Sequence, residues 1–145
     1  MFISFFLSLL LLAKILGVIQ ARMGSNRLPG KVMMQILGKP MIWHIYNRLK
    51  TCNVDEICIA TSTNPNDDKI EEFALKEDIK IFRGSENLIL DRLLSATKKF
   101  KADAIARITA DCPLVDPDIV NHLIQIYRQS PDLDFICNKI GRAHV

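Results

Sequence analysis

The chain has 145 residues, of which 49% are hydrophobic and 24% are charged, and its formal net charge is +3. This composition is ordinary for a globular domain and excludes a low-complexity or disordered chain. Residues 1–54 hold seven of the 19 Lys and Arg residues and no Asp or Glu. The positive region favours an anionic small molecule as ligand. Nucleic acid is the alternative, but no basic, aromatic-interleaved strand or recognition-helix pattern supports it.

The four cysteines exclude two further classes of protein. Cys52, Cys58, Cys112 and Cys137 are far apart in the sequence and form no CxxC pair, and the three histidines do not cluster with them. Neither a disulfide scaffold nor a zinc site is expected, and a reducing cytoplasm is the expected compartment. Cys58 and Cys137 lie in apolar runs and are predicted to be buried.

Both ends of the chain are expected to lie outside the folded domain. Residues 1–13 form a nearly uncharged apolar run with no basic region before it. Because the first strand is expected to begin at Lys14, a membrane helix could not share its residues, so we interpret 1–13 as a leader or a mis-assigned start rather than an anchor. Residues 140–145 resemble a translated sequencing adapter and are predicted to be a non-native tail. The expected domain covers residues 14–139.

Strands and helices are expected to alternate along this domain. The expected strands cover residues 14–20, 56–61, 79–82, 104–109 and a fifth that begins at 134–137. Helices are expected at 40–50, at 67–77, in a segment ending near Phe100, and in a segment that Asp116 caps and Pro117 opens. In the third helix Leu90, Leu93, Leu94 and Thr97 are expected to face inward. This alternation predicts an α/β fold with a mainly parallel sheet covered on both faces, and such sheets bind ligands beyond the carboxyl ends of their strands.

The loop at residues 21–31 directly follows the first strand and is rich in groups that bind phosphate. These groups are Arg22, Arg27, Lys31, Ser25, Gly24 and Gly30. Backbone amides near the two glycines can approach an anion without steric hindrance, and the three cations can neutralise it. The loop is not a Walker P-loop, because five residues separate Gly24 from Gly30 and Val32 follows Lys31. The chain contains no G-x-G-x-x-G either, so we expect a polyphosphate site of another kind.

Two further groups are candidates for the same site. Asp111 follows the fourth strand, where a carboxylate beside a polyphosphate would hold Mg²⁺; the alternative is that it caps a turn. Arg83 and the pair Asp91–Arg92 are the other group, and either arginine could reach a nucleotide or a sugar carboxylate. The alternative for them is a solvated helix start with a local ion pair. Thr61 and Ser62, at the end of the second strand, are a weaker suggestion for a base or ribose contact.

Three ordered motifs resemble the cytidylyltransferases that activate acidic sugars. They are residues 21–31 (ARMGSNRLPGK), residues 83–92 with Arg83-Gly84-Ser85 and Leu90-Asp91-Arg92, and residues 107–117 (RITADCPLVDP). The resemblance covers about Lys14 to Asn138 and includes CMP-Kdo and CMP-acylneuraminate synthetases, especially the spore-coat-polysaccharide branch. The chain departs from that pattern at Asn26, Ala110 and Cys137, where Thr, Gly and Ser are expected.

The resemblance implies a fold and a set of roles. The fold is the nucleotide-diphospho-sugar transferase type, a three-layer α/β/α sandwich, with CTP over the loop after the first strand. Arg22 and Lys31 would be catalytic, and Asp111 would bind the Mg²⁺ cofactor. The residues that would bind the nucleotide are Ala21, Arg22, Gly24, Ser25, Arg27, Lys31, Arg83, Asp91 and Arg92.

The reaction that the resemblance implies is transfer of CMP from CTP to an acidic sugar, with release of pyrophosphate, for surface polysaccharide synthesis. Family members continue for roughly another half, so the chain is expected to be C-terminally truncated, and a homodimer is expected at full length. No nucleic-acid or membrane partner is expected. The alternatives are a nucleotidyltransferase with another base specificity, a non-catalytic nucleotide-binding fragment, and a membrane-tethered remnant.

Overall fold

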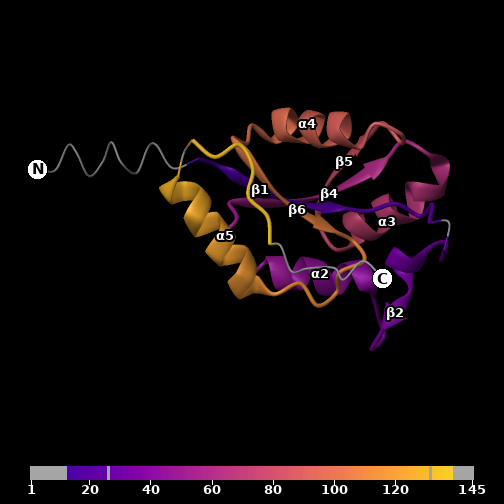
Figure 1. Ribbon diagram of the computed structural model, residues 1–145. Helices are drawn as coiled ribbons and strands as arrows, with labels where there is room; N and C mark the ends of the chain where they lie inside the picture. The colour runs from indigo at the N-terminus through magenta and orange to yellow at the C-terminus, as the bar shows by residue number, and fades with distance from the viewer. Residues whose placement is uncertain (1–12, 26, 131, 139–145) are drawn as a thin grey trace, which may run out of the picture.

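The structure is a computed structural model that describes residues 13–25, 27–130 and 132–138. The predicted tail and all of the predicted leader except Ala13 lie outside the described residues. The centre of the fold is a four-stranded sheet in the order β5–β4–β1–β6 (Figure 1). These strands span Lys80–Gly84 (β5), Glu56–Ser62 (β4), Ile15–Gln20 (β1) and Ala104–Thr109 (β6). All three pairings are parallel, as the sequence predicts.

The two central strands, β1 and β4, are apolar on both faces because helices cover both sides of the sheet. Every residue of β1 from Ile15 to Ile19 is buried. In the register of the sheet, Gln20 at the end of β1 lies opposite Ala60 of β4 and Thr109 of β6. The loops that follow β1 and β6 therefore begin side by side at the same edge of the sheet.

Helices cover the two faces of the sheet in separate layers. Helix α4 (Ile89–Phe100) covers one face, where its Leu93 packs in a cluster with Leu16 and Val18. The opposite face carries α2 (Met41–Leu49), α3 (Asp68–Lys76) and α5 (Pro117–Gln129) (Figure 1). The predicted three-layer α/β/α sandwich is thereby confirmed. In the described part of the chain, no helix combines the length and the apolar composition needed to cross a bilayer.

A short hairpin between the first loop and α2 was not predicted. A 3-10 turn at Lys31–Met33 leads into β2 (Gln35–Ile36), which pairs antiparallel with β3 (Lys39–Pro40). Leu37 and Gly38 turn the chain with positive φ angles of 49° and 76°. Strands of two residues carry no periodic pattern, which is why the sequence indicates only a turn at this point.

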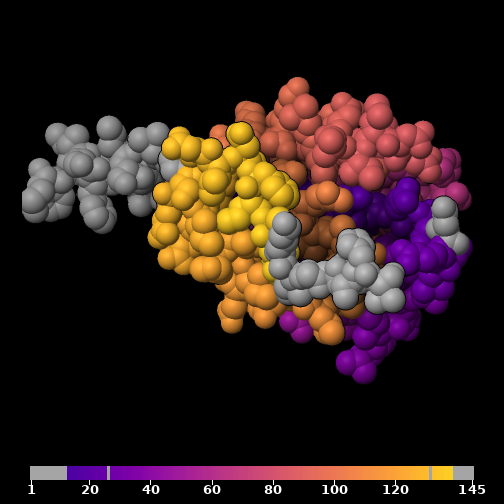
Figure 2. Space-filling view, in the orientation of Figure 1, coloured from indigo at the N-terminus to yellow at the C-terminus, as the bar shows by residue number. Residues whose placement is uncertain are grey.

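The predicted fifth strand is absent from the described residues. Residues 134–137 form no strand and lie on the outer surface, in the yellow segment of Figure 2. Phe135 is 76% exposed, and Cys137, which was predicted to be buried, is exposed. A strand requires backbone pairing with a neighbour, and β6 is an edge strand to which these residues do not pair. The other cysteine predicted to be buried, Cys58, is fully buried, and burial raises the pKa of its thiol to about 12.

The inward face of α4 also differs from the prediction. Leu90 and Leu94 were expected to face inward but are 78% and 54% exposed. The buried residues of this helix are Arg92, Leu93 and Ala96. Leucines occur on two sides of the helix, so their spacing fits more than one rotation about the axis. The sheet selects the rotation that places Leu93 and the small Ala96 against it.

Candidate active site

A cleft of about 350 Å³ lies at the carboxyl ends of β1 and β6. The space-filling view shows a recess between the indigo surface of the first loop and the brown surface of β6 (Figure 2). The residues that line the cleft are Gln20, Arg22, Gly24, Ser25, Arg27, Lys31, Val32, Thr109, Ala110 and Asp111. Six of them are predicted site residues: Arg22, Gly24, Ser25, Arg27, Lys31 and Asp111. The structure therefore brings the two principal motifs together.

One wall of the cleft is the loop at residues 21–31, which we call the phosphate loop. Its backbone closes on itself, because the Gly30 amide donates to the Met23 carbonyl at 2.9 Å. Gly30 has a φ of 72°, a left-handed conformation that disfavours any residue with a Cβ. Ser25 Oγ accepts the Leu28 amide at 3.3 Å. The Gly30–Met23 hydrogen bond thus brings the beginning and the end of the loop together.

The cations of the phosphate loop differ in how far they are committed to protein partners. Arg22 and Arg27 are exposed, and neither forms an ion pair with any residue that the structure describes. Lys31 Nζ lies 2.6 Å from Asp111 Oδ2. The two arginines leave their charge available to an anion, whereas Lys31 shares its charge with the opposite wall of the cleft.

Asp111 is the carboxylate on that opposite wall. The hydrogen bond from Lys31, with a second from the Thr109 hydroxyl, holds the pKa of Asp111 below its ordinary value. The carboxylate is therefore ionised at neutral pH, and its side chain is 44% exposed. An exposed ion pair of this kind stabilises the fold by at most about 1 kcal/mol, so the pair can open at little cost.

The donors around Asp111 fit Mg²⁺ only in the presence of a phosphate ligand. Magnesium prefers oxygen and is commonly held by one or two carboxylates together with substrate phosphates. In residues 13–25, 27–130 and 132–138 no cluster of three or more His, Cys, Asp or Glu residues could hold a metal alone. Asp111 lines the same cleft as three cations that suit a phosphate, so a metal site shared between protein and nucleotide is chemically consistent.

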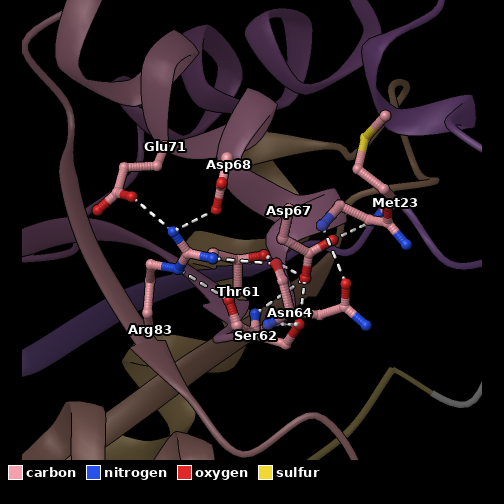
Figure 3. Close-up of polar contacts among 9 residues, drawn as sticks. Met23, Thr61, Ser62, Asn64, Asp67, Asp68, Glu71 and Arg83 are labelled. Atoms are coloured by element: carbon pink, nitrogen blue, oxygen red, sulfur yellow. Dashed lines mark hydrogen bonds and ion pairs between the residues drawn. The ribbon is translucent and has the colours of Figure 1, made fainter.

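Arg83, by contrast, is committed to protein partners outside the cleft (Figure 3). Its Nη1 lies 2.8 Å from Asp68 and 2.6 Å from Glu71. Its Nε and Nη2 donate to the carbonyls of Ser62 and Asn64 at 2.9 and 3.0 Å. The geometry matches the ion-pair alternative for this residue, and its contact with a nucleotide stays a prediction.

The other predicted site residues also lie away from the cleft wall. Ala21 is buried behind the loop, and its amide donates to Ala60 O at 3.1 Å. Asp91 is exposed in the first turn of α4. Arg92 is buried and donates from Nη1 to Ser85 O at 2.7 Å, while its Nε and Nη2 have no partner among the described residues. Burial lowers the pKa of this guanidinium.

Three polar residues near the cleft were not identified as important from the sequence. Asp67 is buried, and its carboxylate accepts hydrogen bonds from Thr61, Ser62 and the Met23 amide. Gln20 and Thr109 contribute to the cleft wall at the ends of β1 and β6. A signal exists for Gln20 and Thr109, since each is a polar residue at the end of a strand, whereas Asp67 has the pattern of an acid at a helix start. The sequence does not say which of these polar residues turn inward.

A second hollow, of about 410 Å³, lies beside α5. Its wall includes Asn53, Asp118, Asn121, His122 and Arg128. It offers one arginine beside an aspartate and amides, so it lacks the concentration of cations that distinguishes the cleft at β1 and β6.

Comparisons with known proteins point to one family. A family model described as cytidylyltransferase matches residues 16–144. The spore coat polysaccharide biosynthesis protein SpsF of Bacillus subtilis is 37% identical over 130 residues, which are 86% of this chain and 54% of that protein. The 3-deoxy-manno-octulosonate cytidylyltransferase of Escherichia coli is 35% identical over 135 residues, 91% of this chain and 54% of that protein. The chain spans about half the length of these relatives.

Solved structures give the same result. A cytidylyltransferase from Leptospira borgpetersenii superposes with a TM-score of 0.74 at 38% identity, over 79% of this chain and 48% of that one. A CMP:2-keto-3-deoxy-manno-octonic acid synthetase complexed with CTP also has a TM-score of 0.74, at 33% identity, over 83% of this chain and 50% of that one. The match of the family model across residues 16–144 shows that this chain belongs to the cytidylyltransferase family.

Proposed function

We propose that this cytidylyltransferase transfers CMP from CTP to an acidic sugar, of the Kdo or nonulosonic type, and releases pyrophosphate. The observation that carries the proposal is the cleft itself, which is lined by Arg22, Arg27 and Lys31 together with the ionised carboxylate of Asp111. The three cations can bind the negative charge of a triphosphate. The carboxylate in the same cleft can bind the Mg²⁺ ion that accompanies the triphosphate.

In the proposed reaction an anomeric hydroxyl of the sugar attacks the α-phosphorus of CTP. The new bond joins the sugar oxygen to phosphorus, the bond from phosphorus to the bridging oxygen of the β-phosphate breaks, and the hydroxyl proton passes to solvent. Pyrophosphate leaves with the electron pair of the broken bond. The protein contributes position and charge, as in other phosphoryl-type transfers.

The residues of the phosphate loop that line the cleft each have a role in this proposal. Arg22 and Lys31 are the catalytic cations, which stabilise the negative charge that develops on the phosphates. Arg27 supports them, and the backbone near Gly24 and the Ser25 hydroxyl bind phosphate oxygens. Asp111 would hold Mg²⁺, which when bound polarises the phosphate and neutralises the leaving group. Ala21, Arg83, Asp91 and Arg92, which do not line the cleft, would also contribute to nucleotide binding.

The acidic sugar is suggested by the relatives rather than by the cleft. One relative is a spore coat polysaccharide biosynthesis protein, and another is a 3-deoxy-manno-octulosonate cytidylyltransferase. We therefore assign the proposed reaction to surface polysaccharide synthesis. As separate proposals, we infer a cytoplasmic location and, for the full-length enzyme, a homodimer.

Pyrophosphate release tests this proposal. The chain is incubated with Mg²⁺, with Kdo or a nonulosonic acid, and with CTP, UTP, GTP or dTTP in turn. Release that depends on both CTP and the sugar acid supports the proposal. Release with another nucleotide would assign a different base specificity. Stabilisation of the fold by CTP without release would instead indicate a nucleotide-binding fragment.

A further inference from the structure

A buried carboxylate connects the end of β4 to the phosphate loop. Asp67 ends a 3-10 turn at Pro65–Asp67, directly before α3, and its side chain is 2% exposed. Burying a charge is unfavourable unless hydrogen bonds satisfy it. Figure 3 shows Asp67 between Met23 on one side and Thr61 and Ser62 on the other.

The two carboxylate oxygens of Asp67 have different partners. Oδ1 accepts the backbone amide of Met23 at 2.7 Å. Oδ2 accepts the Thr61 hydroxyl at 3.0 Å, the Ser62 amide at 3.1 Å and the Ser62 hydroxyl. Two of these donors are backbone amides, which cannot reverse their role. An asparagine at position 67 would therefore place its NH₂ group against a donor at one of the two ends.

Met23 is the residue through which this carboxylate reaches the cleft. It lies between Arg22 and Gly24, both of which line the cleft. Its amide is held by Asp67, and its carbonyl accepts the Gly30 amide at 2.9 Å. A single residue thus joins the entry and the exit of the phosphate loop, and Asp67 anchors that residue to the sheet.

Further hydrogen bonds hold the segment around Asp67 in place. Arg83 donates to the carbonyls of Ser62 and Asn64 and pairs with Glu71 on α3, so it ties the segment before Asp67 to the helix after it (Figure 3). The Ser62 hydroxyl also accepts the Asn64 amide at 3.2 Å. Movement of the carboxylate would require several hydrogen bonds to break together.

We propose that Asp67 is a positioning residue that holds the Met23 amide and thereby fixes the phosphate loop in the shape that binds the nucleotide's phosphates. The inference rests on the proposed function for the identity of the ligand. It goes beyond that function by assigning a role to a residue that lines no part of the cleft. Loss of the contact is expected to weaken phosphate binding through the backbone, with all three cations of the loop still present.

The test compares Asp67→Asn with two matched variants. Asp68→Asn removes the neighbouring carboxylate, which pairs with Arg83 and does not contact Met23. Asn64→Ala removes the hydrogen bonds of the Asn64 side chain to the Asn66 amide and to Glu86, at the start of the 3-10 turn that ends at Asp67, and leaves the Met23 contact in place. Calorimetry of the 145-residue chain gives Kd for CTP with Mg²⁺ and for inorganic pyrophosphate. NMR hydrogen exchange without ligand reports on the Met23 and Gly30 amides.

We expect Asp67→Asn to weaken both ligands at least tenfold and to speed exchange of both amides at least tenfold. Asp68→Asn is expected to change each quantity less than twofold. Asn64→Ala is expected to lower Tm while Kd changes less than threefold, which separates positioning from a general loss of stability. If Asp67→Asn does not fold, Asp67→Glu displaces the carboxylate by one methylene and tests the same contact.

Two failures are distinguishable. If the parental chain binds CTP and a folded Asp67 variant binds it equally well, this inference is wrong and the proposed function stands. If the parental chain binds neither CTP nor pyrophosphate, the proposed function is wrong and the positioning role is overturned with it.

Discussion

Lys31 Nζ and Asp111 Oδ2 lie 2.6 Å apart, although 80 positions separate the two residues in the sequence. The strands that precede them make the contact possible, because β1 and β6 are parallel neighbours whose ends are level. The cation proposed for the triphosphate and the carboxylate proposed for Mg²⁺ thus neutralise each other in the protein alone. A nucleotide that enters the cleft must compete with Asp111 for Lys31.

Replacement of Lys31 tests the catalytic cation. We expect Lys31→Ala to slow CTP-dependent pyrophosphate release by roughly 30- to 1,000-fold, or about 2–4 kcal/mol, by analogy with the loss of other charge-stabilising donors. Lys39→Ala is the control, because Lys39 lies on the hairpin above Trp43 and outside the cleft. Parental rates in the Lys31 variant would exclude it from catalysis.

Replacement of Asp111 should change the effect of Mg²⁺ in a characteristic way. Without metal, Asp111→Asn releases Lys31 from its ion pair and removes a negative charge that would repel the phosphates of CTP. Because an exposed ion pair is worth at most about 1 kcal/mol, CTP is expected to bind about two- to fivefold tighter. With Mg²⁺, the variant is expected to lose the gain in affinity that the parental chain shows. Calorimetry with and without EDTA measures both effects.

The control for this experiment is Asp116→Asn. Asp116 caps α5 by accepting the Asp118 amide at 2.9 Å, and Asn is an equally good cap. This variant is expected to keep the parental response to Mg²⁺. A parental response in Asp111→Asn as well would place the metal site elsewhere.

The presence of Lys31 and Asp111 in one cleft could be anticipated because it follows from topology. A buried parallel strand produces a continuous apolar run, and the run at Ile15–Gln20 identifies its own carboxyl end. Once β1 and β6 are placed in one parallel sheet, the loops after them share an edge. The three-layer fold and the position of the cleft follow from the same reasoning.

Other features depend on tertiary contacts that no local sequence pattern specifies. The apolar residues at 134–137 fit a strand, but strand formation also requires a pairing partner, which the pattern does not reveal. Leu90 and Leu93 are equally apolar, and only packing against the sheet decides that Leu93 is buried. Asp67 looks like an ordinary acid at a helix start, and its contact with Met23 bridges 44 positions of the sequence.

Acid should destabilise the chain through Asp67. Burial alone would raise the pKa of Asp67, but hydrogen bonds from Met23, Ser62 and Thr61 outweigh it and place the pKa below its ordinary value. A carboxyl with a lowered pKa in the folded state contributes stability above the unfolded value of about 3.9. That contribution is lost as the pH falls through the folded pKa.

Urea unfolding at pH 7 and at pH 3 measures this loss. The free energy of unfolding is expected to fall on acidification in the parental chain and to fall less in Asp67→Asn, which cannot titrate at this position. Asp111 also has a lowered pKa, so Asp111→Asn serves as the comparison for a half-exposed carboxyl. Equal acid sensitivity of the parental chain and Asp67→Asn would contradict the prediction.

Alanine at the two glycines of the phosphate loop should affect two different properties, stability at Gly30 and phosphate binding at Gly24. Gly30 has a φ of 72°, and a Cβ there would lie 3.3 Å from Met23 Cε, so Gly30→Ala is expected to lower the free energy of unfolding by about 1–2 kcal/mol. Gly24 has no positive φ and no atom within 4 Å of an added Cβ, so Gly24→Ala should change stability by less than about 0.5 kcal/mol. Gly24 lines the cleft, however, and a methyl group there obstructs the backbone approach to phosphate. Urea unfolding and CTP calorimetry on both variants check this contrast, and a stability loss at Gly24 with none at Gly30 would contradict it.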